Sequence, residues 1–277
     1  AKNKPRTDWD CTYLPHGVSK SFYPISKFDK EYKKVEAIKN NLTDEDVEFI
    51  LFYNNRNIRR KMTSDVILAF KTFCDKLTPE QAKKVCLLMH TQPIDDNGTN
   101  LPEVARVVCP DYKVYFSDRK LETHELNYLF NLSDVTINIA SNEGFGLGTC
   151  ESLMASTPII VNVTGGLQDQ CGFKLRKYNS DNSGFSEELL TADDYTEIQS
   201  LHDWRKWENN NDLTHGEWVK PVWPKTRALQ GSPPTPYIFD DRADWFDVSE
   251  RIYEWYQMSK DDREKCGTKG RKFVMNE

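Results

Sequence analysis

The 277-residue sequence has no apolar run that approaches the roughly 20 residues needed to cross a bilayer. Its polar N-terminal stretch, AKNKPRTDWD, also lacks the apolar core of a secretory signal peptide. Charges of both signs are interspersed, the net charge is −6, and there is no long basic block. We therefore expect no transmembrane segment and no nucleic-acid partner.

Metal-binding and disulfide patterns are also missing. There is no C-x-x-C motif and no histidine pair at metal-ligand spacing, so we predict no metal site. The acidic segment 95–98 (DDNG) is interpreted as a turn. Seven cysteines without paired spacing are typical of a reduced intracellular protein, and we expect a cytoplasmic localisation.

Apolar segments alternate with amphipathic helices along the first part of the chain. The near-continuous apolar run at 47–53 is typical of a strand that is buried on both faces. Further strands are predicted at 85–90, 112–116, 135–139 and 158–163, with helices between them. Five strands that alternate with helices predict an α/β protein with a doubly wound parallel sheet.

The segment 134–170 holds the most informative pattern. A strand leads into the small-residue turn 141–146 (SNEGFG), and a helix predicted at 147–156 follows. Glycines at 144 and 146 let backbone N–H groups approach a ligand closely, and the start of the helix adds unpaired N–H donors and a positive dipole end. This arrangement favours an anion such as a diphosphate.

Two carboxylates accompany the same turn. Glu143 precedes the glycines, and Glu151 lies within the predicted helix after seven intervening residues. Carboxylates repel phosphate, but each ionised oxygen accepts hydrogen bonds from sugar hydroxyl groups. The turn therefore predicts a site for a ligand that is part phosphate and part sugar.

A basic loop follows the first strand. Residues 55–62 read NRNIRRKM and contain Arg56, Arg59, Arg60 and Lys61. Loops at the carboxyl ends of parallel strands present the ligand-binding groups of α/β sheets. The alternative interpretation is a solvated basic turn.

Together these segments resemble the donor-binding signature of retaining glycosyltransferases of the GT-B fold, family 4 (glycosyltransferase group 1). The turn and helix supply E-G-F-G-L and E-S-L-M-A-S-T-P-I-I-V, and Gly165-Gly166 supply the trailing glycine pair. The basic loop is similar to the family's G-R-x4-K-G pattern, with Arg56 and Lys61 at the matching positions. It departs from that pattern at Asn55 and Met62, where the family carries glycine.

The resemblance implies a hexosyltransferase-type enzyme that transfers a sugar from a UDP-, GDP- or ADP-sugar with retention of configuration and without a required cofactor. Lys61 and Arg56 would hold the diphosphate and stabilise the leaving group, and the extra cations Arg59 and Arg60 could share that role. Glu143 would contact the donor sugar, and Glu151 the ribose. The remaining donor-binding residues implied are Gly144, Phe145, Gly146, Leu147, Gly165 and Gly166. The acceptor, whether carbohydrate, protein or lipid, stays unidentified.

The resemblance also bears on domain organisation. Pro15-His16-Gly17-Val18 is similar to the start of a C-terminal GT-B domain, so residues 1–277 are expected to form a single nucleotide-sugar-binding domain, the C-terminal half of the fold. The N-terminal GT-B domain would be absent, and it supplies part of the catalytic site. We therefore expect the isolated chain to be weakly active or inactive.

After the glycine pair the alternation stops. Residues 171–241 are polar, contain four tryptophans, and are expected to form an irregular insertion, whereas 245–275 predict two C-terminal helices. The tryptophans are expected to pack as the core of the insertion. A carbohydrate-stacking platform, or a cover over a surface that meets another domain, is the alternative.

Three other functions stay open at this point. A non-catalytic nucleotide-sugar-binding module would have the same turn, and a sugar-nucleotide epimerase would share the fold. An interaction domain would show no nucleotide affinity.

Overall fold

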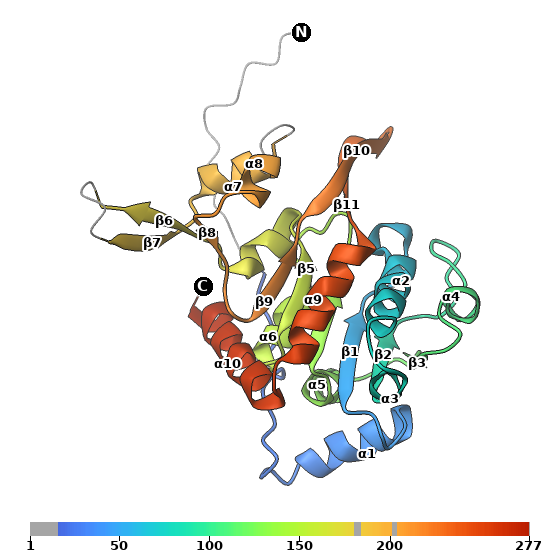
Figure 1. The fold of residues 1–277 in the computed structure, drawn as a ribbon. Helices are drawn as coiled ribbons and strands as arrows, with labels where there is room; N and C mark the ends of the chain where they lie inside the picture. The colour runs from blue at the N-terminus through green and yellow to red at the C-terminus, as the bar shows by residue number, and fades with distance from the viewer. Residues whose placement is uncertain (1–15, 180–183, 201–203, 277) are drawn as a thin grey trace.

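The computed structural model of the chain describes residues 16–179, 184–200 and 204–276. Its centre is a six-stranded parallel sheet in the order β3-β2-β1-β4-β5-β9 (Figure 1). The strands are β1 (Phe49–Asn54), β2 (Val85–His90), β3 (Lys113–Ser117), β4 (Val135–Asn138), β5 (Ile159–Asn162) and β9 (Val219–Val222). The predicted α/β class with a doubly wound parallel sheet is confirmed.

Helices cover both faces of the sheet. The longer ones are α1 (Tyr32–Leu42), α2 (Thr63–Cys74), α4 (Leu101–Val108), α5 (Thr123–Leu132), α6 (Leu147–Met154), α9 (Trp245–Gln257) and α10 (Lys260–Asn276). The short ones are η1 (Arg59–Lys61), α3 (Pro79–Ala82), η2 (Gly165–Cys171), α7 (Ala192–Ile198) and α8 (Trp204–Glu208).

Alternate residues of β1 show how the two layers are built. Leu51 and Tyr53 pack in one cluster with side chains of α2 and α9, whereas Ile50 and Phe52 pack in a second cluster with those of α1 and α5. Successive side chains of a strand point to opposite faces, so a strand that is covered on both sides must be apolar throughout. This is why the runs at 47–53 and 85–90 were recognisable as strands.

The strand order reverses between β1 and β4, the two central strands of the sheet. The chain moves outward from β1 to β2 and β3, and then returns to place β4 on the other side of β1. The loops that follow β1 and β4 therefore leave these adjacent strands in opposite directions. Open α/β sheets bind ligands between two such loops, beyond the carboxyl ends of the strands. These two loops are the basic loop and the glycine turn.

The segment 171–241 is more regular than expected. It contains a small antiparallel sheet in the order β7-β6-β8, formed by β6 (Lys174–Tyr178), β7 (Phe185–Leu189) and β8 (Leu213–Thr214). It also supplies β9, the edge strand of the main sheet, and most of the hairpin of β10 (Pro224–Ser232) and β11 (Thr235–Ala243). The sequence did not predict β9 because it contains Pro221, which an edge strand tolerates and a central strand does not.

The tryptophans of this segment are structural. Trp204 and Trp207 are buried, and the ring of Trp223 stacks on Phe173. Trp218 stacks on Phe273 of α10, with ring centroids 4.6 Å apart. The segment therefore uses its tryptophans as its own core and as a contact to α10, as expected, and they do not form an exposed platform.

Helices α9 and α10 occupy the predicted C-terminal helical region. A buried ion pair between Arg263 of α10 and Asp134, 2.7 Å long, fixes α10 to the start of β4. None of the helices in the described part of the chain combines the length and apolar character that a membrane crossing requires. The six described cysteines are buried and free, and Cys11 lies outside the described residues.

Candidate functional site

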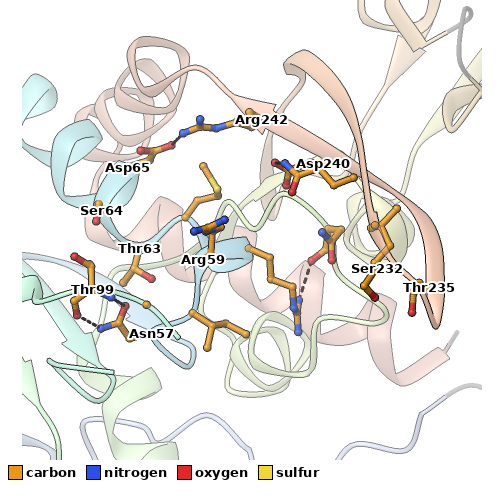
Figure 2. A pocket seen from close by; sticks show the side chains of 18 residues that line it. Asn57, Arg59, Thr63, Ser64, Asp65, Thr99, Ser232, Thr235, Asp240 and Arg242 are labelled. Atoms are coloured by element: carbon orange, nitrogen blue, oxygen red, sulfur yellow. Dashed lines mark hydrogen bonds and ion pairs between the residues drawn. The ribbon is translucent and has the colours of Figure 1, made fainter. Parts of the chain in front are cut away.

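The basic loop after β1 contains the 3-10 turn η1, in which the basic side chains point in different directions. Arg59 faces a cavity (Figure 2), whereas Lys61 is buried. Met62 then adopts a left-handed conformation, with φ 52° and ψ 38°, before α2 begins. This is one of the two positions where the family pattern has glycine, the residue that adopts this conformation most readily.

The glycine turn after β4 is hydrogen-bonded to the basic loop. The Ser141 amide donates to the Arg60 carbonyl at 2.8 Å, and Arg60 Nη1 donates to the Asn142 carbonyl at 2.9 Å. Two loops that are far apart in sequence are thus held together at the point where the strand order reverses.

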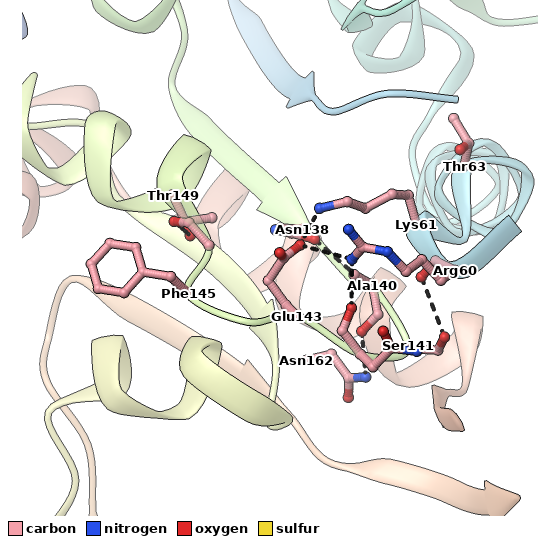
Figure 3. A network of polar contacts seen from close by, with 12 residues as sticks. Arg60, Lys61, Thr63, Asn138, Ala140, Ser141, Glu143, Phe145, Thr149 and Asn162 are labelled. Carbon is pink, nitrogen blue, oxygen red and sulfur yellow. Dashed lines mark hydrogen bonds and ion pairs between the residues drawn. The ribbon is translucent and has the colours of Figure 1, made fainter. Parts of the chain in front are cut away.

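Lys61 and Glu143 form the centre of the site. The ammonium of Lys61 makes an ion pair with Glu143 Oε2, and Arg60 Nη1 lies 3.5 Å from the same oxygen (Figure 3). The two side chains of the pair are only 10% and 11% exposed. Burial lowers the pKa of Lys61, and the contact with Glu143 offsets part of that effect.

Two glycines are required by the geometry of the turn. Gly146 has φ +87° and is the residue that precedes α6. Gly165 has φ +49°, and a Cβ there would lie 2.0 Å from the Glu143 carbonyl oxygen. The neighbouring Gly166 amide donates to that carbonyl at 2.9 Å, so the backbone of Gly165 and Gly166 packs directly against the backbone of Glu143.

The other side of the turn is open. A Cβ at Gly144 would meet no atom within 4 Å, and Leu147 is exposed. Phe145 lies beside the ring of His16, with centroids 5.1 Å apart, and its carbonyl accepts a hydrogen bond from Gln170. A ligand can therefore approach the backbone of the turn and the first turn of α6.

Glu151 lies one turn into α6 and is half-buried. None of the described side chains or backbone groups hydrogen-bonds its carboxylate. Burial raises the pKa of this group from 4.5 to about 7. A half-buried carboxylate without a protein partner has its acceptor capacity available for ligand hydroxyl groups.

Arg56 is placed differently from Lys61. Its Nε lies 3.0 Å from Asp95 Oδ2, and its side chain is 62% exposed. Asp95 also accepts from the Asn97 amide at 2.9 Å, as expected for the predicted turn at 95–98. The structure thus brings together Lys61, Glu143 and the glycine turn, and leaves Arg56 paired elsewhere.

Arg60 contacts the glycine turn, which the sequence did not predict. Its guanidinium hydrogen-bonds both the Asn142 carbonyl and the Glu143 carboxylate. The sequence considered Arg60 only as an extra cation that could share the diphosphate, because the family pattern carries no fixed residue at this position. Among the described residues there is no cluster of three or more His, Cys, Asp or Glu side chains that could hold a metal ion.

Several solved structures resemble this chain along most of its length. The C-terminal domain of a glycosyl transferase group 1 family protein (LpcC) from Francisella tularensis has a TM-score of 0.57 at 13% identity, covering 94% of this chain and 98% of that domain. Sucrose-phosphate synthase from Thermosynechococcus elongatus has a TM-score of 0.56 at 18% identity, covering 95% of this chain and 47% of the synthase. The chain shares the fold of GT-B glycosyltransferase structures.

A third structure contains a ligand. Anabaena HepE in complex with UDP-glucose has a TM-score of 0.58 at 10% identity, covering 94% of this chain and 51% of HepE. The chain thus spans about half the length of HepE and of the synthase. No protein-family model matches the chain, and no curated protein sequence matches it. At these identities the similarity establishes the fold, and the chemistry must be argued from the residues of this chain.

Proposed function

We propose that this chain is the donor-binding C-terminal half of a retaining GT-B glycosyltransferase resembling family 4, and that it binds a nucleotide-diphosphate sugar. The observation that carries the proposal is the position of the Lys61–Glu143 pair. It lies beside an open glycine turn and the N-terminus of α6, where the strand order of the sheet reverses.

The diphosphate is assigned to Lys61 and to the backbone amides of the turn and of Leu147. A phosphate that approaches Lys61 would replace Glu143 as the partner of the ammonium. Glu143 would then be free to accept hydrogen bonds from hydroxyl groups of the donor sugar. Arg60 would remain beside Glu143 and hold its carboxylate in place.

The ribose is assigned to Glu151, whose carboxylate has no protein partner among the described residues. Its ionised form accepts two hydroxyl donors. The structure of Anabaena HepE contains UDP-glucose, so we propose a UDP-hexose as the donor, with GDP- and ADP-sugars as the alternatives to test.

In the transfer step the acceptor oxygen forms a bond to the anomeric carbon, and the bond from that carbon to the diphosphate breaks. The electron pair leaves with the diphosphate, which also takes the proton of the acceptor hydroxyl. Lys61 would offset the negative charge that develops on the leaving group, and Arg56 would assist once it releases Asp95. This chain spans half of enzymes of this kind, so we expect donor binding with weak or no transfer by the chain alone.

Calorimetric titration of the chain with UDP, GDP and ADP tests the proposal. We expect one nucleotide to bind with roughly micromolar affinity. Binding should weaken tenfold or more in Lys61→Ala, the loss expected of a charge-assisted hydrogen bond. Lys83→Ala, which removes an exposed cation just after α3 that pairs with Glu80, is the matched control and should bind like the wild type.

Gly144→Ala provides a second test that leaves the ion pair intact. The added methyl group would project into open space, so folding should be unchanged while the approach of phosphate is hindered. If none of the three nucleotides binds the folded wild-type chain at millimolar concentration, the proposal is wrong.

A further inference from the structure

Helix η2 packs against the glycine turn and donates hydrogen bonds to its carbonyl groups. The Gly166 amide donates to the Glu143 carbonyl at 2.9 Å. The side-chain Nε2 of Gln170 donates to two more carbonyls, that of Phe145 at 2.7 Å and that of Gly146 at 3.0 Å. These three carbonyl groups of the turn therefore point toward η2.

The direction of these carbonyls determines where the next amides point. In a planar trans peptide, the C=O of one residue and the N–H of the next point in opposite directions. The amides of Gly144, Gly146 and Leu147 therefore point away from η2. No described residue accepts a hydrogen bond from the Gly144 or the Gly146 amide. The Leu147 amide lies in the first turn of α6, where a helix leaves its N–H groups unpaired.

The side of the turn that faces away from η2 is open to solvent. A Cβ at Gly144 would meet no atom within 4 Å there, and Leu147 is exposed. Several N–H groups that point the same way at a helix N-terminus form a site for phosphate oxygens. The contacts of the carbonyls with η2 thus present the amides to a ligand.

Gln170 has a different weight for each of its two carbonyl partners. The Gly146 carbonyl also accepts hydrogen bonds from Thr149 Oγ1 at 2.9 Å and from the Cys150 amide at 3.1 Å. Gln170 is the only described donor to the Phe145 carbonyl. The orientation of the peptide between Phe145 and Gly146 therefore depends on Gln170, because glycine permits this peptide to rotate.

Gln170 is itself fixed in one orientation. The residue is buried, and its backbone carbonyl accepts a hydrogen bond from Trp218 Nε1 at 2.9 Å. The side-chain Oε1 is also buried and has no hydrogen-bond partner among the described residues. Only the nitrogen end of the amide can donate to the two carbonyls, so these contacts determine which way the side chain is turned.

The start of the turn is held by residues other than Gln170. The Asp241 amide donates to the Ser141 carbonyl at 2.8 Å, and Asp241 forms a buried ion pair with Arg227, with Nε and Oδ1 2.5 Å apart. Arg60 donates to the Asn142 carbonyl. A change at Gln170 should therefore alter the middle of the turn and leave its start in place.

We propose that Gln170 is a positioning residue for the diphosphate of the donor. It holds the carbonyls of Phe145 and Gly146 toward η2, and thereby directs the amides of Gly146 and Leu147 toward the phosphate oxygens. Gln170 acts through these amides and does not touch the ligand. The inference rests on the proposed function.

Gln170→Met tests the inference, because it removes the donor and keeps the length of the side chain. UDP, GDP and ADP are titrated into the isotope-labelled chain, and binding is followed by amide NMR spectra. We expect the nucleotide that binds the wild type to bind the variant about tenfold more weakly, and the Gly146 amide signal to lose its response to binding. Gln168→Met changes a buried glutamine of η2 that makes no hydrogen bond to the turn, and it should behave like the wild type.

Gln170→Glu adds a readout that a purely structural role would not produce. The ionised carboxylate cannot donate and would face two carbonyl oxygens, whereas the protonated acid can donate one hydrogen bond. The affinity of this variant relative to wild type should therefore recover between pH 8 and pH 5. The other carboxyl groups of the turn, α6 and η2, namely Glu143, Glu151 and Asp169, are present in both proteins, so the ratio isolates the introduced group.

The outcomes separate this inference from the proposed function. If Gln170→Met binds nucleotide like the wild type while Lys61→Ala does not, the positioning role is refuted and the donor site stands. Equal losses in Gln170→Met and Gln168→Met also refute it, as does a Gln170→Glu affinity ratio that is the same at both pH values. This ratio decides the question if Gln170→Met does not fold. If the wild type binds none of the three nucleotides, both proposals are wrong.

Discussion

Replacing Glu151 by glutamine should stabilise the ligand-free protein above pH 7 and weaken its binding of nucleotide. The carboxyl group is half-buried in α6, and its pKa is raised to about 7 because burial disfavours the charged form. Glutamine has nearly the same shape and carries no charge to desolvate. The variant therefore removes a cost that the ligand-free wild type bears when the carboxylate is ionised.

The size and sign of the effect follow from proton linkage. The folded state holds this proton more tightly than the unfolded state, so the wild type loses stability through this group as pH rises from about 4.5 to 7. At a pH above both pKa values, the difference between them corresponds to a loss of about 3 kcal/mol in the free energy of unfolding. Partial exposure of the carboxyl group reduces this loss to about 1–2 kcal/mol. The glutamine variant shows none of this loss.

Urea unfolding of both proteins at pH 5 and at pH 8 measures the effect. We expect the difference in free energy of unfolding, Glu151→Gln minus wild type, to be about 1–2 kcal/mol higher at pH 8 than at pH 5. Glu264→Gln, an exposed change on α10, is the control and should show no such pH dependence. At pH 8 the Glu151 variant should also bind UDP about tenfold more weakly. An equal stability difference at the two pH values would refute the desolvation argument.

Three further variants test how the site is built. Lys61→Ala should lower the free energy of unfolding by about 3 kcal/mol, because it leaves Glu143 buried beside a single, more distant cation, Arg60. In a double-mutant cycle, the Lys61→Ala, Glu143→Ala variant should lose less stability than the sum of the two single variants. Gly146→Ala should cost about 1–3 kcal/mol in thermal unfolding because of its left-handed conformation and crowded Cβ position, whereas Gly144→Ala should stay within about 0.5 kcal/mol of wild type. Asp241→Asn should destabilise the protein by about 3–5 kcal/mol and speed hydrogen exchange in the β10–β11 hairpin; unchanged exchange would show that the hairpin is held by other contacts.

The layers of the sheet were predictable from sequence because burial on both faces leaves a continuous apolar signal. The runs at 47–53 and 85–90 correspond to β1 and β2 with shifts of at most two residues. The glycine turn was also predictable, since Gly146 lies at a backbone conformation that few other residues adopt and Gly165 at a close approach of two segments. Local signals of this kind depend on neighbours in sequence, and a single sequence contains them.

The contacts that shape the site depend on residues far apart in sequence. The pairing of Arg56 with Asp95 joins loops after β1 and β2, and no spacing within either loop indicates it. The β10–β11 hairpin begins in the segment 171–241, which the sequence predicted to be irregular. It is joined to the glycine turn and to the loop after β5 by hydrogen bonds of Asp241, whose amide donates to the Ser141 carbonyl and whose Oδ2 accepts from Thr164 Oγ1. Such pairs become visible only when the topology places their elements side by side.

The Lys61–Glu143 pair has a consequence for binding as well as for folding. Both side chains are about nine-tenths buried, so each charge needs the other, or a substitute, to offset its desolvation. A diphosphate can replace Glu143 as the anionic partner of Lys61. Sugar hydroxyl groups can replace Lys61 as the partner of Glu143 only in part, because they donate hydrogen bonds but carry no charge. A ligand that carries both groups can therefore replace the pair at once, whereas a free sugar leaves Lys61 without an anion. On the proposed function, the ligand-free ion pair would therefore favour ligands in which phosphate and sugar are covalently joined, as they are in a nucleotide-sugar donor.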